Sequence, residues 1–292
     1  MQDADLVVFN YYRHPLAAML IEERAKLNQP WCFWGERPGL RGPEWAGRLF
    51  RRQKLRWLHS STAPIWGIGK FALSTYRSEF GPARQYFNLP YFSNLQRFSD
   101  SAHSRNGTTD RTFLFSGSLI PRKGVDLLAK AFVRLRTEGH AAKVKIVGDG
   151  PLRRSLERTL GAVESSVEFC GFVDWSELVS HYASTHVLCV PSRYDGWGMV
   201  VPEGLASGLP VIATDRMGAA LEFIETGRNG WLIPAGDADA LFNAMREAVT
   251  MSAATFARFS TSAQQSVTDH SLQHGASRFK QYSAQVVSNW TV

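Results

Sequence analysis

The stretch from Ser192 to Pro210, SRYDGWGMVVPEGLASGLP, constrains the fold of this chain more than any other. It follows an apolar run, carries two closely spaced glycines, and leads through a helical pattern to a glycine, a proline and another apolar run. This order predicts a buried strand, a tight turn, a helix and a further strand. Such a turn exposes backbone N–H groups and the positive end of the helix dipole, where an anion or a set of hydroxyl groups can dock.

Two carboxylates bracket the predicted turn, with seven residues between them. Asp195 comes just before the helix and Glu203 lies about one turn into it, so we expect both to reach one cleft at the carboxyl ends of the strands. Carboxylates there can accept hydrogen bonds from paired hydroxyls, as on a ribose or a hexose. Two isolated acids of this kind would more often be a helix cap and a solvated surface residue, but the glycines and the neighbouring motifs favour a site.

Strand-like and helix-like segments alternate on both sides of this stretch. In the C-terminal part the predicted strands cover residues 113–116, 144–147, 167–169, 187–190, 211–213 and 231–233. They predict a doubly wound parallel sheet of about six strands. In the N-terminal part the predicted strands cover residues 6–9, 31–34 and 85–87, with helices at residues 17–27 and 71–80. A polar stretch from Asn88 to Asp110 predicts a linker between the two parts.

The pattern of acid, seven residues and acid, with an internal Gly-Trp-Gly and a trailing Gly-Leu-Pro-Val, resembles the motif of the retaining glycosyltransferases of family 4. The resemblance is strong from Phe113 to Val249 and looser from Asp3 to Pro90. It implies an α/β chain of the GT-B fold, with two Rossmann-like domains and parallel sheets. The N-terminal domain is expected to be incomplete, because the chain begins at what resembles a middle strand.

The resemblance implies three regions. Residues 1–105 correspond to the acceptor-side domain and linker, residues 106–265 to the nucleotide-sugar donor domain, and residues 266–292 to a helix that crosses back to the first domain. The implied activity is transfer of a hexosyl unit from a nucleotide diphosphate sugar to a saccharide or lipid-linked acceptor, with retention of configuration. The family works without a metal or another cofactor, usually in polysaccharide or lipid-linked saccharide assembly.

The resemblance also implies catalytic roles for three residues. Glu203 would hold the ribose hydroxyls and Asp195 the donor hexose, although aspartate is one methylene shorter than the glutamate that is commoner there. Lys123 matches the lysine that contacts the diphosphate. The two acids are assigned to hydroxyl recognition and do not form the carboxylate pair of an ordinary retaining glycosidase, so we expect no covalent glycosyl-enzyme.

The segment GSLIPRKG, residues 117–124, contains Lys123 but lacks the second phosphate contact that is usual in the family. The family usually has an arginine directly after the first glycine, where this chain has Ser118. Arg122 is an alternative donor of positive charge, although adjacent residues normally point in different directions. Further donor contacts implied by the resemblance are Gly117, Gly150, Phe172, Val173, Gly196, Trp197, Gly198, Met199 and Val200.

In the N-terminal part, family members commonly place a histidine at a strand end that faces the donor sugar. The corresponding strand here ends at Trp34-Gly35-Glu36, so Glu36 is a candidate for the cleft, with a surface pair between Glu36 and Arg37 as the alternative. His14 follows another predicted strand and is a second candidate, unless it only begins a helix.

The chain carries a formal charge of +7, which suits anionic partners. Much of the excess lies between Glu36 and Arg56, where basic and apolar residues interleave as in an amphipathic helix. Two interpretations fit equally well: a helix that lies on an anionic membrane surface, and a helix that packs on its own sheet. Nucleic acid is not an expected partner, because no known binding module accompanies these charges.

Three scattered cysteines, Cys32, Cys170 and Cys189, predict buried thiols in a reducing compartment rather than disulfides or a zinc site. The sequence has no signal peptide pattern and no run long enough to span a membrane, so we expect a cytoplasmic protein, or a peripheral one on the inner face of the membrane. Two other classes of protein stay open. One is a non-catalytic nucleotide-sugar binding protein or inactive homologue, suggested by Ser118 and the short acceptor side, and the other is a peripheral membrane scaffold.

Overall fold

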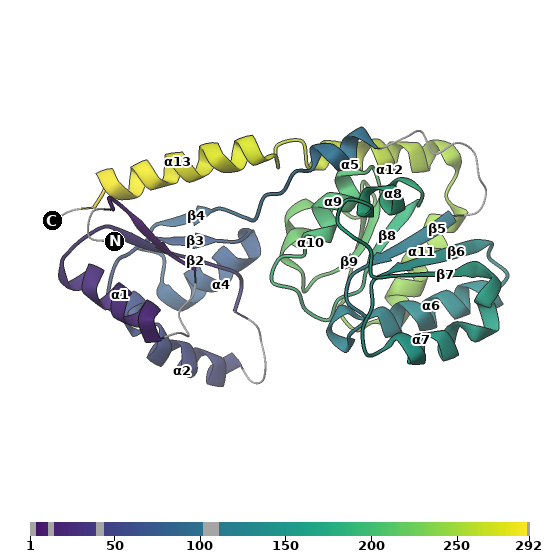
Figure 1. Ribbon diagram of the computed structural model, residues 1–292, viewed down its shortest axis with the longest axis horizontal. Coiled ribbons are helices and arrows are strands. Elements are labelled where there is room, and N and C mark those ends of the chain that lie inside the picture. The colour runs from purple at the N-terminus through teal and green to yellow at the C-terminus, as the bar shows by residue number, and fades with distance from the viewer. Residues whose placement is uncertain (1–3, 11–14, 39–43, 102–110, 291–292) are drawn as a thin grey trace. The chain divides into compact units, whose positions relative to one another are not determined.

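The computed structural model describes residues 4–10, 15–38, 44–101 and 111–290 (Figure 1). The chain divides into two compact units, one built from residues 1–92 and 272–292 and the other from residues 93–271. Each unit contains one sheet, with four strands in the first and six in the second, and every strand pair recorded in them is parallel. The prediction of an α/β fold with two parallel sheets is therefore confirmed.

The sheet of the second unit has the strand order β10-β9-β8-β5-β6-β7. Its strands are β5 (Arg111–Ser116), β6 (Ala142–Val147), β7 (Val167–Gly171), β8 (Val187–Val190), β9 (Val211–Thr214) and β10 (Gly230–Ile233). The chain proceeds outward from β5 to β7, then returns to the other side of β5 and proceeds outward again from β8 to β10. The reversal lies between β5 and β8, the place where ligands bind in open parallel sheets.

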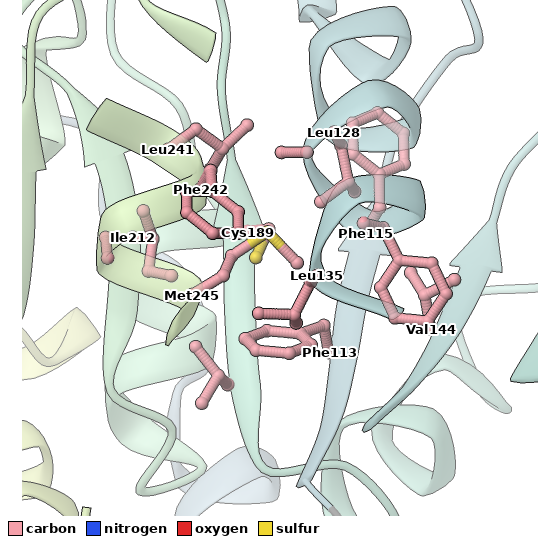
Figure 2. Packing of buried hydrophobic residues seen from close by; sticks show 14 of the residues in the cluster. Phe113, Phe115, Leu128, Leu135, Val144, Cys189, Ile212, Leu241, Phe242 and Met245 are labelled. Atoms are coloured by element: carbon pink, nitrogen blue, oxygen red, sulfur yellow. The ribbon is translucent and has the colours of Figure 1, made fainter. Parts of the chain in front are cut away.

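The helices of the second unit precede, connect or follow these strands. They are α5 (Gln96–Asp100), η1 (Pro121–Lys123), α6 (Val125–Thr137), α7 (Arg153–Leu160), η2 (Gly161–Ser166), α8 (Leu178–Ala183), α9 (Val200–Ala206), α10 (Gly218–Phe223), α11 (Ala238–Thr250) and α12 (Ala253–Ser266). Leu128 and Leu135 of α6 and Phe242 and Met245 of α11 pack with strand residues such as Phe113 in one buried cluster (Figure 2). This core fixes the strands whose ends carry the candidate site.

The sheet of the first unit has the order β1-β2-β3-β4. Its strands are β1 (Val7–Phe9), β2 (Trp31–Gly35), β3 (Ile65–Gly67) and β4 (Tyr86–Asn88), and its helices include α1 (Pro15–Lys26), α2 (Glu44–Lys54), α3 (Arg56–His59) and α4 (Lys70–Phe80). Side chains alternate between the two faces of the strands. Trp31 and Phe33 join a core with Leu55, Leu58 and Tyr76, whereas Cys32 and Trp66 belong to a second cluster.

The helix α13 (Leu272–Ser288) belongs to the first unit and contributes side chains to the second cluster. The Phe279 ring meets Trp66 edge-on at 5.4 Å, and Tyr282 lies 4.8 Å from Phe87. Val286 is buried in the same cluster. The last long helix therefore completes the core of the unit that contains the first residues of the chain.

Three local predictions were wrong. The strand β3 falls between Ser60 and Phe71, where no strand was predicted. The predicted basic helix from residue 36 to 56 is shorter, since Glu36–Pro38 are not helical and α2 begins at Glu44. The predicted linker contains α5, which belongs to the second unit because Phe98 is buried there.

All three cysteines are free, and two of them, Cys32 and Cys189, are buried as predicted. Cys170 is only half-buried, because it lies near the end of the edge strand β7. Every helix that the structure describes is too short or too polar to cross a lipid bilayer.

Candidate functional site

The candidate site lies in the second unit, where the loops that follow β5 and β8 meet at the reversal of strand order. Glycines let the β5 loop pass close to the β8 loop and to the loop after β6, without side chains between them. A Cβ atom on Gly148 would lie 2.0 Å from the Gly117 carbonyl oxygen, and one on Gly150 would lie 2.7 Å from that of Leu119. Gly124 has a positive φ of 69°, and its Cβ would lie 1.9 Å from the Pro191 oxygen. Glycine is required where backbones approach this closely.

Arg193 links the loop that follows β8 to the segment that follows β5 by hydrogen bonds. Its guanidinium donates two hydrogen bonds to the Asp126 carboxylate, at 2.8 and 2.7 Å, and a third to the Pro121 carbonyl at 2.5 Å. The pair with Arg193 lowers the pKa of Asp126. The Arg193 backbone N–H also donates to the Arg122 carbonyl at 2.8 Å. These contacts hold the residues after β8 beside the residues after β5.

As a result, Asp195 lies against two cations. The Lys123 Nζ donates to Asp195 Oδ2 at 2.5 Å, and Arg122 Nη1 lies 3.6 Å from the same oxygen. The side chain of Lys123 is 19% exposed and that of Asp195 is 15% exposed, so this pair is largely shielded from water. The expectation that neighbouring residues diverge does not hold here, because Arg122 and Lys123 belong to the tight turn η1 and both reach one carboxylate.

Glu203 sits in α9 and is buried, with 8% of its surface exposed. Its Oε2 accepts a hydrogen bond from the Tyr182 hydroxyl at 3.3 Å, and Tyr182 also hydrogen-bonds the Ser116 side chain at the end of β5. Burial raises the pKa of Glu203 to about 7, although the Tyr182 hydrogen bond and the charge of Arg97 both act in the opposite direction. The carboxyl group therefore changes charge near neutral pH.

Arg97 and Phe98 of α5 support this buried acid. The Phe98 ring meets Tyr182 edge-on at 5.2 Å, and the Arg97 guanidinium stacks 3.5 Å above the Trp175 ring centre. Arg97 also donates to the Trp175 carbonyl. Sequence reasoning missed Arg97, Tyr182 and the Arg193–Asp126 pair. Arg97 and Tyr182 precede Glu203 by many residues, so no spacing pattern identifies them, whereas Arg193 lies within the motif itself.

The predicted donor contacts at residues 196–200 differ in whether they are buried or open to a ligand. Gly198 has a φ of 90°, a left-handed conformation that favours glycine at this position beside Asp195. The Trp197 ring, by contrast, is 1% exposed and packs on Phe223 and His270, so its side chain forms core rather than a binding surface. The other predicted contacts in this motif are Gly196, which is buried, and Met199 and Val200, which are half-buried.

The other predicted contacts are Ser118, which follows β5, and Phe172 and Val173, which follow the edge strand β7. Ser118 is exposed, and Phe172, directly after β7, has 80% of its surface exposed, whereas Val173 is half-buried. An exposed aromatic ring beside a strand end is available for stacking on a flat ligand.

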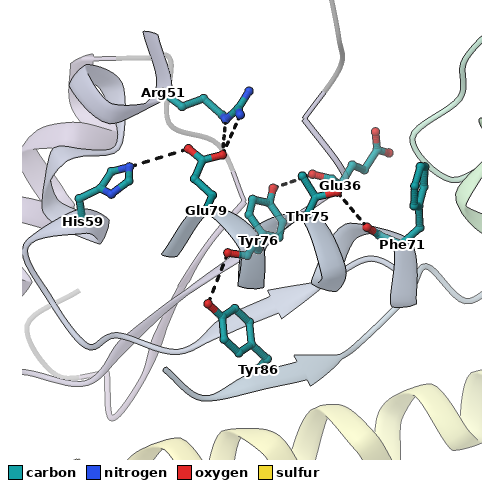
Figure 3. Close-up of polar contacts among 8 residues, drawn as sticks. All are labelled: Glu36, Arg51, His59, Phe71, Thr75, Tyr76, Glu79 and Tyr86. Atoms are coloured by element: carbon teal, nitrogen blue, oxygen red, sulfur yellow. Dashed lines mark hydrogen bonds and ion pairs between the residues drawn. The ribbon is translucent and has the colours of Figure 1, made fainter. Parts of the chain in front are cut away.

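Of the two N-terminal candidates, Glu36 and His14, the structure describes Glu36. Glu36 belongs to the first unit, where its side chain hydrogen-bonds Tyr91 and its carbonyl oxygen accepts from the Tyr76 hydroxyl at 2.6 Å (Figure 3). His14 lies outside the described residues. Within the described part of the chain, no group of three His, Cys, Asp or Glu side chains is arranged to hold a metal ion.

Comparison with known proteins identifies relatives of this chain. The model of the family "Glycosyl transferases group 1" matches residues 110–251, which contain the site. A "GDP-mannose-dependent alpha-(1-6)-phosphatidylinositol monomannoside mannosyltransferase" of Mycolicibacterium smegmatis is 30% identical over 218 residues, which are 69% of this chain and 56% of that protein. A "GDP-mannose-dependent monoacylated alpha-(1-6)-phosphatidylinositol monomannoside mannosyltransferase" of Corynebacterium glutamicum is 29% identical over 206 residues, which are 65% of this chain and 54% of that protein. The chain thus spans little more than half the length of these relatives.

Solved structures show the same architecture over nearly the whole chain. A sucrose-phosphate synthase from Thermosynechococcus elongatus has a TM-score of 0.77 at 22% identity, covering 97% of this chain and 74% of that one. Anabaena HepE, solved in complex with UDP, has a TM-score of 0.79 at 17% identity, covering 98% and 79%. At these identities the likeness establishes the fold alone. The mannosyltransferase that is 30% identical over 69% of this chain and the family match around the Asp195–Glu203 motif establish that the chain belongs to the glycosyl transferases group 1 family, and the structural likeness shows that it has the GT-B fold.

Proposed function

We propose that the protein is a retaining glycosyltransferase that moves a hexosyl unit from a nucleoside diphosphate sugar to a hydroxyl group of a saccharide or lipid-linked acceptor. The observation that carries this proposal is the cluster of Lys123, Arg122 and Asp195 at the reversal point of a parallel sheet. Two cations that share one carboxylate leave net positive charge where a diphosphate docks in folds of this kind.

In the proposed reaction, Lys123 stabilises the leaving diphosphate. The ammonium group has three hydrogens, so it can donate to a phosphate oxygen while it keeps its bond to Asp195. Negative charge grows on the diphosphate as its bond to the sugar breaks, and a cation already fixed in place lowers the energy of that state. Asp195 then binds hydroxyls of the donor hexose, and Glu203 binds hydroxyls of the ribose. No covalent glycosyl-enzyme is part of this proposal.

For the donor, we propose GDP-mannose. The support comes from the mycobacterial and corynebacterial relatives, which are GDP-mannose-dependent phosphatidylinositol monomannoside mannosyltransferases. A lipid-linked acceptor is proposed on the same ground. The exposed Phe172 and the half-buried Val173 are the residues that we expect beside the base.

The test is a calorimetric titration of the purified chain with GDP, UDP and ADP, followed by a transfer assay with the matching nucleotide sugar. We expect GDP to bind most tightly. Lys123→Ala should weaken binding by about tenfold or more, because an ion pair with a shielded phosphate is lost. The matched control is Lys143→Ala, which removes an exposed lysine near the start of β6 and should leave the affinity unchanged.

The outcomes separate the classes of function. Binding of none of the three nucleotides by the folded protein would overturn the proposal. Nucleotide binding without transfer to any saccharide or lipid-linked acceptor would instead identify a non-catalytic nucleotide-sugar binding protein. Tightest binding of UDP would keep the enzyme class and replace the proposed donor.

A further inference from the structure

The hydrogen bonds of Arg193 converge on the turn η1, which carries the two cations of the candidate site. The guanidinium group donates from Nη1 to the Pro121 carbonyl and to Asp126 Oδ1, and from Nη2 to Asp126 Oδ2. The backbone N–H of Arg193 donates to the Arg122 carbonyl. Because Asp126 lies in the first turn of α6, Arg193 holds the chain on both sides of the Gly124 junction, at η1 and at the start of α6.

The turn η1 holds the loop after β8 in return. Arg122 Nη1 donates to the Tyr194 carbonyl at 3.1 Å. The same Nη1 lies 3.6 Å from Asp195 Oδ2, to which Lys123 Nζ donates at 2.5 Å. The hydrogen bonds therefore run in both directions between the two segments, and the positions of both cations depend on how the loop after β8 is held.

The contacts of Arg193 require a guanidinium group. Its N–H groups point in fixed directions within one plane, so one side chain can donate to both oxygens of a carboxylate and to a carbonyl at once. A lysine would keep the charge but lacks this planar fork. The side chains of Arg193 and Asp126 are 40% and 35% exposed, and ion pairs this open to water add little to the stability of a fold. The main effect of the pair is therefore on the geometry of η1.

We propose that Arg193 is a positioning residue for the diphosphate of the donor: it holds η1 so that Arg122 and Lys123 meet the leaving phosphate together. This inference rests on the proposed function. Arginine and lysine side chains lose much rotamer freedom when a ligand fixes them, and cations that are already in place avoid that cost at binding. The same preorganisation favours the state in which negative charge grows on the diphosphate. Arg193 acts through these two residues rather than by contact with the donor.

The test is calorimetric titration of the whole chain with GDP and with GMP, which lacks the second phosphate. Arg193→Gln should weaken GDP binding by about tenfold, the size of one hydrogen bond to a charged group, and GMP binding by about twofold at most. Arg193→Lys should lose nearly as much GDP affinity, because the contacts depend on the fork rather than on the charge. If another nucleoside diphosphate binds more tightly, it and its monophosphate replace this pair.

The matched control is Arg134→Gln. Arg134 lies in the last turn of α6, its side chain is 48% exposed, and it pairs at 2.8 Å with Asp239 of α11, outside the candidate site. This variant removes an exposed ion pair of the same helix and should leave GDP affinity unchanged. Denaturant unfolding should show similar, small losses of stability in Arg134→Gln and Arg193→Gln, so a loss of GDP affinity in Arg193→Gln alone would not come from unfolded protein.

A second measurement separates positioning from a general structural role. In a variant with both Arg122→Gln and Lys123→Ala, the cations through which Arg193 acts are gone. Adding Arg193→Gln to this variant should therefore not weaken the residual GDP binding any further. A general structural role predicts the same loss of affinity with and without the two cations.

Three results would overturn this inference and leave the proposed function standing. They are equal losses of GDP and GMP affinity in Arg193→Gln, full GDP affinity in Arg193→Lys, and the same loss from Arg193→Gln whether or not the two cations are present. Binding of no nucleotide by the unaltered, folded protein would overturn both the inference and the proposed function.

Discussion

The carboxyl group of Glu203 combines burial with a hydrogen bond from Tyr182, and its pKa of about 7 lies well above that of an exposed glutamate. If the ionised form binds the ribose hydroxyls, as we propose, nucleotide affinity depends on the charge of this one group. The ionised fraction rises as pH increases through the pKa, so affinity should rise with pH.

We therefore predict that the affinity for the preferred nucleotide increases about tenfold between pH 6 and pH 8 and then levels off. Calorimetric titration across this range measures it. The control is Glu203→Gln, which cannot ionise and retains only the titration of the nucleotide's own phosphates. A profile that is the same in Glu203→Gln and in the unaltered protein would contradict the role assigned to Glu203.

Tyr182→Phe tests how the acid is held. Loss of the hydroxyl removes a donor that favours the carboxylate, so the midpoint of the pH profile should move to higher pH. The Phe ring keeps the packing against Phe98, so the fold should survive. An equal loss of affinity at every pH would instead indicate a purely structural role for Tyr182.

Among elements, the junction of η1, α6 and the β8 loop depends on one glycine. Gly124 joins η1 to α6 in a left-handed conformation, and a side chain there would meet the Pro191 backbone rather than a movable group. The same junction places Lys123 against Asp195. Stability and site geometry are therefore linked at this position.

We predict that Gly124→Ala lowers the free energy of unfolding by about 3 kcal/mol or more, through backbone strain and the clash together. The matched control is Gly139→Ala at the other end of α6, where φ is 86° and nothing lies within 4 Å of the added Cβ. It should cost only about 1 kcal/mol, because it carries the strain without the clash. Denaturant unfolding measures both, and equal costs would show that the close approach to Pro191 is unimportant.

The elements also show which local predictions the sequence supports. The strands of the second unit are rich in apolar residues, and the sequence predicts each of them to within about two residues of its ends. The strand β3 has only three residues, Ile65–Gly67, and it is defined by its neighbours β2 and β4 rather than by its own pattern. Similarly, α5 is a helix of five residues, and it forms where the Phe98 side chain is buried against Tyr182.

For the whole molecule, the two units have separate hydrophobic cores. The residues to which the proposed function gives a role in donor binding lie in the second unit. A ligand that binds one unit stabilises that unit by mass action and leaves the other unchanged, unless the two unfold as one.

We predict two transitions in scanning calorimetry, of which only the larger moves when nucleotide is added. At a nucleotide concentration of about one hundred times Kd, the stabilisation should be about 2.7 kcal/mol. In Lys123→Ala this shift should shrink, while the smaller transition stays in place. A single transition that moves as a whole would show that the two units unfold cooperatively.

By itself the sequence determined the fold class, the six-stranded sheet and the acidic motif, because apolar periodicity and glycine placement are properties of neighbouring residues. It also identified Lys123 and Asp195, but as residues 72 positions apart with no stated relation. Only the tertiary structure decided that they form an ion pair, that Trp197 packs inside the core, and that Glu203 is buried beside Tyr182. Contacts and burial of this kind depend on which distant segments pack together, and local patterns carry no information about a partner that lies far away in the chain.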